Sequence, residues 1–216
     1  MTENNSLIPL NDLPVSKYDD KSFDALAKAA TWLPRINLQG TGSNMVKEDK
    51  IKQGHFALIE SKESFADLTN SFDCVVISWR PKAMRVDGDQ VINVHNPQSP
   101  EFEKIVAEAD QPDSGCLYGP EFLLWVKGAS KFATFFMSSK TLRREAPNLK
   151  TLIGKAATVR SKLIKTQKYS WFGCTVTPCS TPFDIPPIAE IKEQAAKFAN
   201  PGEKEVESAP TDGRAR

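Results

Sequence analysis

Long apolar runs are missing from this sequence of 216 residues. No stretch reaches the ~18 consecutive apolar residues of a membrane-spanning helix. The first ten residues contain Glu3 and no basic residue, and they lack the apolar segment of a secretion signal. We therefore expect a soluble protein that stays in the cytoplasm and has no membrane partner.

Cysteine and histidine are scarce, with four and two residues respectively. Cys174 and Cys179 are five positions apart, outside the Cys-x2-Cys spacing of zinc knuckles, and only His55 and His95 could supplement them. Cys74 lies in an apolar run, which is typical of a buried free thiol. We predict no metal site, and free thiols fit a reducing compartment.

Recognisable catalytic and cofactor motifs are also absent. The sequence has no Gly-x-Ser-x-Gly, and residues 40–44 (GTGSN) lack the third glycine and the Lys-Ser/Thr pair of phosphate-binding loops. Neither histidine belongs to a local nucleophile signature. We predict a protein that is not an enzyme and has no cofactor.

Net charge is close to zero, at +1, but the charge is unevenly distributed. The stretch from Lys140 to Lys168 holds nine basic residues and one acid, Glu145, so it carries +8 and the remainder carries −7. Such polarity favours an anionic partner for the basic segment.

The hydrophobic periodicity predicts mostly strands. We expect them over residues 35–40, 54–60, 73–80, 83–86, 91–94, 122–127, 131–138, 157–166 and 168–177. Helices are predicted over residues 21–30, 99–109 and 187–199, and as two short turns within 139–154, the second starting at Pro147.

This order of several strands, a helix and a final strand pair predicts a mainly β fold with a few helices. An elaborated five-stranded barrel of the oligonucleotide-binding (OB) type fits it, and an α+β sandwich is the alternative. We divide the chain into a flexible lead-in (1–30), an OB-like nucleic-acid-binding domain ending in a helix (31–199) and a tail (200–216). The tail has almost no apolar residues, which predicts disorder.

The most informative stretch combines cations with aromatic residues. Alternate residues of a strand share a face, so Phe172, Cys174 and Val176 form one apolar face, while Tyr169 and Trp171 point the other way. In the preceding strand, the residues that share one side are Arg160, Lys162 and Ile164.

Single-stranded nucleic acid would use both parts of this surface. Cations neutralise phosphates, and aromatic rings stack on unpaired bases at ~1–3 kcal/mol per base. The alternatives are a solvated lysine face that prevents edge aggregation, aromatic rings packed under the terminal helix, or a docking site for an acidic protein.

Five segments resemble a family of bacteriophage single-stranded DNA-binding proteins. They are residues 33–38 (LPRINL), 79–83 (WRPKA), 118–122 (YGPEF), 139–147 and 171–182, and the resemblance covers about residues 31–198. It implies an OB fold and a role in coating or protecting single-stranded DNA during replication or recombination, without sequence specificity. It also implies a host-cell cytoplasmic location, with phage or host replication proteins as further partners. The chain departs from the family in its tail, which ends Arg214-Ala215-Arg216 instead of in acidic residues.

We therefore hypothesise a single-stranded DNA-binding protein and leave homo-oligomerisation open. The runner-up is a virion or host-interaction structural protein with a basic docking face. The residues expected to contact phosphates are Arg143, Arg144, Lys150, Arg160, Lys162, Lys165 and Lys168. Those expected to stack on bases are Tyr169, Trp171 and Trp79.

Overall fold

The computed structural model describes residues 33–61, 63–87, 90–111, 113–181, 184–200 and 204–208. The lead-in predicted for residues 1–30, with its short helix, lies outside these residues. No helix in the described ranges is long and apolar enough to cross a membrane.

Ten strands of the described chain belong to one large, mostly antiparallel sheet, which confirms the mainly β prediction. The strands are β1 (Arg35–Leu38), β2 (Phe56–Ile59), β3 (Phe65–Asp67), β4 (Ser71–Asp87), β5 (Gln90–Val94), β6 (Cys116–Val126), β7 (Lys131–Phe136), β8 (Ala156–Lys165), β9 (Ser170–Pro178) and β10 (Lys204–Ser208).

The strand order is β10-β5-β4-β6-β7-β1-β2-β3. In addition, β8 pairs with β4, and β9 pairs with β8. All of these pairings are antiparallel except the short parallel contact between β1 and β7. Among the described strands, β3 and β9 each pair on one side only, so backbone hydrogen bonds do not close this sheet into a barrel.

A single large core nevertheless fills the curve of the sheet. It combines residues of β2, β4, β7 and β9, including Phe56, Phe72 and Phe135, whose rings meet edge to face at centroid distances of 5.0–6.3 Å. Leu142 and Leu149 add the contribution of two short helices to the same core. Packing of side chains in this core therefore connects strands that no backbone hydrogen bonds join.

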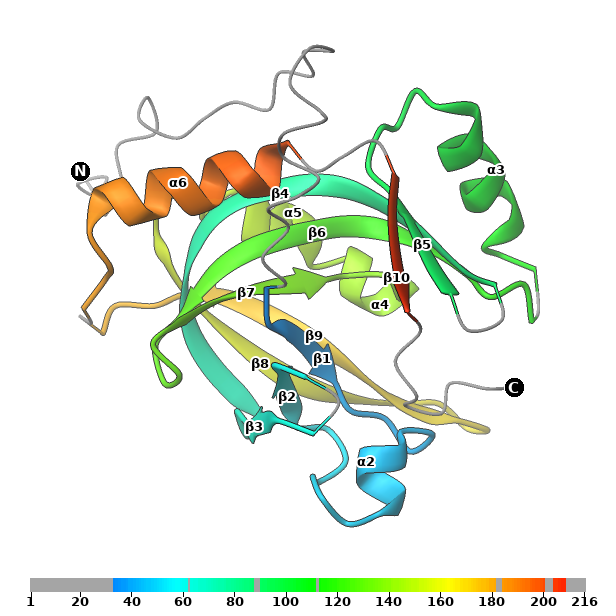
Figure 1. The fold of residues 1–216 in the computed structure, drawn as a ribbon. Helices are drawn as coiled ribbons and strands as arrows, with labels where there is room; N and C mark the ends of the chain where they lie inside the picture. Colours follow the sequence, from blue (N-terminus) through cyan, green and yellow to red (C-terminus); the bar gives the residue numbers. More distant parts are fainter. Residues whose placement is uncertain are drawn as a thin grey trace.

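Five helices of the described chain pack around the sheet (Figure 1). Among them, α3 lies against β4 and β6, α4 and α5 contact β9, and α6 contacts β4. The apolar face of α6 covers a second core on the other side of β4, β6 and β7. The helices are α2 (Asn44–Lys47), α3 (Pro100–Glu108), α4 (Lys140–Arg143), α5 (Ala146–Lys150) and α6 (Ile188–Ala199).

Strand β4 is continuous through Pro81, where the sequence had predicted a break. Pro81 stands opposite Pro120 of β6, and neither residue has an N–H to give to the other strand. Their carbonyls point outward instead: His95 Nδ1 donates to Pro81 O at 3.2 Å, and the Met137 N–H donates to Pro120 O at 2.9 Å. At both prolines the backbone nitrogen faces away from the other strand, so the absent N–H groups cost the pairing between β4 and β6 no hydrogen bond.

Other elements also differ from prediction. Strand β6 begins at Cys116, before the strand predicted over residues 122–127, because residues 116–119 pair with the extended β4. Helix α2 and strand β3 were not predicted, since each is only three or four residues long.

The predicted disorder of residues 200–216 does not hold for β10. These five residues pair antiparallel with β5, with Val206 opposite Ile92. Composition misled here because a strand at the edge of a sheet gains its backbone hydrogen bonds whatever side chains it carries.

Candidate nucleic-acid interface

The basic, aromatic stretch forms the hairpin of β8 and β9. Its pairing runs without a register shift from Ala157 opposite Pro178 to Lys165 opposite Ser170. The alternation expected for the second strand is therefore present, and Gly173 introduces no bulge. Beyond Ser161, whose N–H donates to Asn70 O, β8 pairs with no other described strand on its β4 side, so the hairpin continues as a two-stranded arm (Figure 1).

One face of the hairpin is buried at its base. Cys174 and Val176 belong to the main core, as the alternation predicted, and Val159 of β8 lies there with them. Burial, reinforced by the charge of Glu145, raises the pKa of the Cys174 thiol to about 12. The thiol is therefore neutral and serves as a small apolar side chain.

The opposite face carries the predicted ligand-binding residues. Opposing residues share a face, so Lys162 lies with Gly173 and Ile164 with Trp171. Arg160 and Lys162 are exposed, and 37% of the Trp171 surface is accessible. The structure thus brings two cations and one aromatic ring onto a common face, here called the outer face.

Tyr169 lies at the hairpin tip, in the turn before β9, and not in the strand as predicted. The turn is fixed by Thr166, whose N–H and hydroxyl both donate to Tyr169 O and whose hydroxyl accepts from the Tyr169 N–H. Tyr169 is 72% exposed, and Lys165 and Lys168 near it in the chain are exposed as well. The tip therefore presents an aromatic ring among cations.

Exposed apolar side chains concentrate on this hairpin. Within the described ranges, five large hydrophobic residues are exposed, and three of them are Leu163, Tyr169 and Trp171. No described carboxylate forms an ion pair with Arg160, Lys162, Lys165 or Lys168. Apolar surface next to uncompensated positive charge is typical of a binding site.

Helix α4 extends this surface at the base of the arm. A Cβ added to Gly173 would lie 3.3 Å from Thr141 Cβ and 3.1 Å from Ile164 Cδ1, so the absence of a side chain lets α4 approach the outer face. The exposed Lys140 and Arg144 flank this contact in sequence. Arg144 thus directly follows an element that touches the hairpin.

The remaining predicted residues have internal partners. Arg143 donates to the carbonyls of Tyr118 and Ser138, and its guanidinium lies 4.2 Å from the centre of the Tyr118 ring. Lys150 Nζ lies 4.1 Å from the Trp79 ring, and Trp79 itself packs against the main core. These cation–π contacts join α4 and α5 to β4 and β6. The structure does not place Arg143 or Trp79 as free surface groups.

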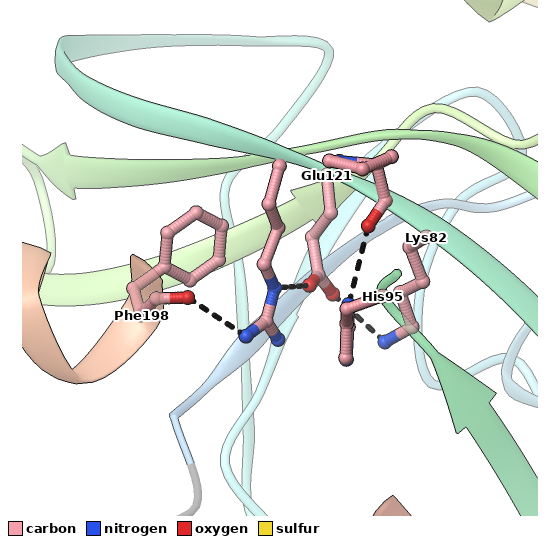
Figure 2. A network of polar contacts seen from close by, with 6 residues as sticks. Lys82, His95, Glu121 and Phe198 are labelled. Atoms are coloured by element: carbon pink, nitrogen blue, oxygen red, sulfur yellow. Dashed lines mark hydrogen bonds and ion pairs between the residues drawn. The ribbon is translucent and has the colours of Figure 1, made fainter. Parts of the chain in front are cut away.

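A buried charge network lies elsewhere, between β4, β6 and α6, and the sequence did not reveal it. Glu121 lies between the guanidinium of Arg80 and the ammonium of Lys82, at 2.7 and 2.8 Å. Figure 2 shows Glu121 with Lys82 and His95 on one side and Phe198 on the other. Arg80 also donates to Phe198 O at the end of α6 and lies over the Phe198 ring. Burial raises the pKa of Glu121, but the charges of Lys82, Arg80 and His95 outweigh it and hold this pKa well below its ordinary value.

The two histidines have structural partners. His95 is buried beside this network and bonds to Pro81 O, and His55 Nδ1 contacts the Asp67 carboxylate at 2.9 Å. In the described part of the chain, no group of three or more His, Cys, Asp or Glu side chains could hold a metal ion.

Comparison with known proteins adds no relative. No family model matches the chain, and no curated protein or solved structure matches it. The functional argument therefore depends on the hairpin and its surroundings.

Proposed function

We propose that this protein binds single-stranded DNA through the β8–β9 hairpin, in the manner of the phage single-stranded DNA-binding proteins that its sequence resembles. The observation that carries the proposal is the gathering of exposed Trp171 and Tyr169 with four exposed cations on one projecting arm, none of which pairs with a carboxylate of the described residues. Unpaired bases offer π-faces to such rings, and phosphates offer negative charge to the cations. A duplex hides its bases, so a single strand is the better ligand.

The strand order supports an OB-like interpretation of the fold. Strands β4, β6 and β7 are neighbours in the sheet and antiparallel, α4 and α5 follow β7 in the chain, and β8 and β9 complete the set. The long β4 pairs with β6 on one edge and β8 on the other, as the first strand of a barrel does. On this interpretation β1–β3, the β5–α3 segment and β10 are additions.

The position of α6 favours the hairpin over the more usual OB surface. OB folds bind oligonucleotides on the face of their second and third strands and on the loop between the fourth and fifth. Here Leu123 of β6 and Phe132 of β7 are buried under Ile191 and Phe198 of α6. The hairpin between β8 and β9 is the part of that surface that stays accessible.

A fluorescence titration with labelled oligothymidine tests the proposal. We expect saturable binding, quenching of tryptophan emission and weaker binding to a duplex of equal length. Equal affinity for duplex and single strand, or no binding at low salt, would contradict it.

The second candidate is a structural protein whose basic arm docks on an acidic protein surface. The same cations favour it, but it leaves the exposure of Tyr169 and Trp171 unexplained. A structural protein of this kind should show no preference for single strands, so the same titration separates the two.

A further inference from the structure

The hairpin has a second accessible face, opposite the outer face. Leu163 stands opposite Phe172 in the β8–β9 register, one position from the Ile164–Trp171 pair, and so points to the other side of the arm. Leu163 is 43% exposed, whereas Val159 and Val176, on the same side nearer the base, are buried in the core. On this side, apolar side chains are therefore buried near the base of the arm and become exposed beyond the edge of the sheet. Here this side of the arm is called the inner face.

The loop before β2 borders the inner face. Gly54 has a φ of +82° and packs directly against the Phe172 ring. The contact is so close that a Cβ added at Gly54 would lie 2.4 Å from the ring. Because Gly54 contacts Phe172, the residues just before Gly54 lie next to the inner face, and two of them, Lys52 and Gln53, are exposed. Lys165 shares the side of Leu163 and is also exposed. An apolar side chain is therefore accompanied by cations from two separate elements.

One carboxylate beside this loop, that of Asp67, is already engaged. Asp67 contacts His55 Nδ1 at 2.9–3.0 Å and accepts the Thr69 N–H at 2.7 Å. Its charge is partly offset by these donors, so it opposes a bound anion less than a free carboxylate would.

We propose that the inner face binds a second segment of the same nucleic-acid strand, which passes around the hairpin tip from the outer face. This inference rests on the proposed function. Tyr169 and Lys168 at the tip connect the two faces, so cations continue from Lys162 through Lys168 to Lys165 without an intervening described acid. Bases of the second segment contact Leu163 and the edge of Phe172, and Lys165 and Lys52 contact its phosphates.

The geometry predicts a dependence on oligonucleotide length. A short strand occupies the outer face alone, where Trp171 gives the stronger stacking. A strand long enough to pass the tip engages both faces, and the second segment then binds at a high effective concentration. Residues of the inner face should therefore affect only long ligands.

The test compares oligothymidines of about 6 nucleotides, near the lower end of the ~4–16 nucleotides that one OB fold covers, and of about 24 nucleotides, beyond its upper end. We expect the double variant Leu163→Asn/Lys165→Gln to bind the long strand about tenfold more weakly, which corresponds to ~1.4 kcal/mol, and to bind the short strand within twofold of the parent. Trp171→Ala serves as the matched control and should weaken both. A thermal melt checks that each variant is folded.

Equal loss for the two lengths, or no loss for either, would overturn the second face while leaving the proposed function intact. If the parent protein binds neither strand, the proposed function itself fails. Lys52→Gln/Lys165→Gln, which alters two exposed lysines and no apolar residue, should show the same length dependence even if Leu163→Asn lowers the melting temperature.

Discussion

The molecule uses positive charge in two contrasting ways. In the buried network, Arg80 and Lys82 surround one carboxylate, and their donors are bonded to Glu121 and to a helix carbonyl. On the hairpin, the cations are exposed and have no carboxylate partner among the described residues. The first arrangement fixes where α6 ends on the sheet, and the second leaves charge available to a ligand. The number of basic residues is therefore a poor guide to function unless their partners are known.

The sharpest contrast should come from removing the central carboxylate. Glu121→Gln leaves Arg80 and Lys82 buried without a counter-charge, and we expect it to lower the free energy of unfolding by about 3–5 kcal/mol. Urea unfolding followed by circular dichroism measures this. Glu193→Gln, which alters an exposed i,i+4 pair with Lys197, is the control and should change stability by less than ~0.5 kcal/mol. Equal losses of unfolding free energy in the two variants would contradict a stabilising role of the buried network.

Acid should weaken the same network. The pKa of Glu121 is lowered in the folded state, so its contribution is complete above the ordinary value of 4.5 and is lost as the pH falls below it. We expect the stability difference between the parent and Glu121→Gln to shrink by about 1.4 kcal/mol per pH unit below pH 4.5. Urea midpoints measured across this range test it, and a constant difference would contradict the assigned pKa direction.

Two tryptophans should separate binding from folding. Trp171→Ala removes a partly exposed ring and should weaken oligothymidine binding by ~1–3 kcal/mol with little change in the melting temperature. Trp79→Ala removes a ring that packs on the core and should instead destabilise the fold by ~3–5 kcal/mol. One titration and one melt on each variant decide this. If Trp171→Ala unfolds the protein, or binds as tightly as the parent, the outer face is not a stacking surface.

Salt should distinguish the free cations from the paired ones. The logarithm of the affinity should fall linearly with the logarithm of the salt concentration, by about 0.7 per phosphate contacted. Lys162→Gln should reduce this slope by about that amount, whereas Arg143→Gln, which breaks an internal contact, should not. A flat salt dependence of the parent would eliminate phosphate contacts altogether.

The smallest effect is expected at the tail. Ending the chain at Asn200 removes the pairing of β10 with β5 and should lower the melting temperature by a few degrees, equivalent to ~1 kcal/mol. Ending it after Ser208 keeps that strand and should leave the temperature unchanged. Calorimetry of both truncations tests the role of β10, and identical melting curves would show that the strand contributes no stability.

The sequence predicted the hairpin well because its signal is local. Strand periodicity alone separated Cys174 and Val176 from Trp171, and the register places them on opposite faces. The acidic and basic partners of the buried network gave no such signal. Arg80 and Glu121 are far apart in the chain, and charged residues are usually exposed, so only the pairing of β4 with β6 brings them together.

The errors at prolines and in the tail share one physical origin. A proline interrupts a strand only if its missing N–H faces a partner, and at Pro81 it does not. A polar tail pairs only if an edge is available, and β5 provides one. Whether Pro81 interrupts its strand and whether the tail pairs both depend on which strand lies alongside. The local sequences of these two segments do not contain that information.

The length of β4 also affects how the chain folds. Its partners β6 and β8 are synthesised long after it, and Arg35 of β1 pairs with Thr134, roughly a hundred residues away. Contacts between such distant residues require large loops to close first, which slows folding to the millisecond-to-second range typical of β-rich topologies. On the ribosome, β4 cannot complete its pairing until the hairpin has emerged, so folding of this sheet finishes only when the proposed DNA-binding arm has been made.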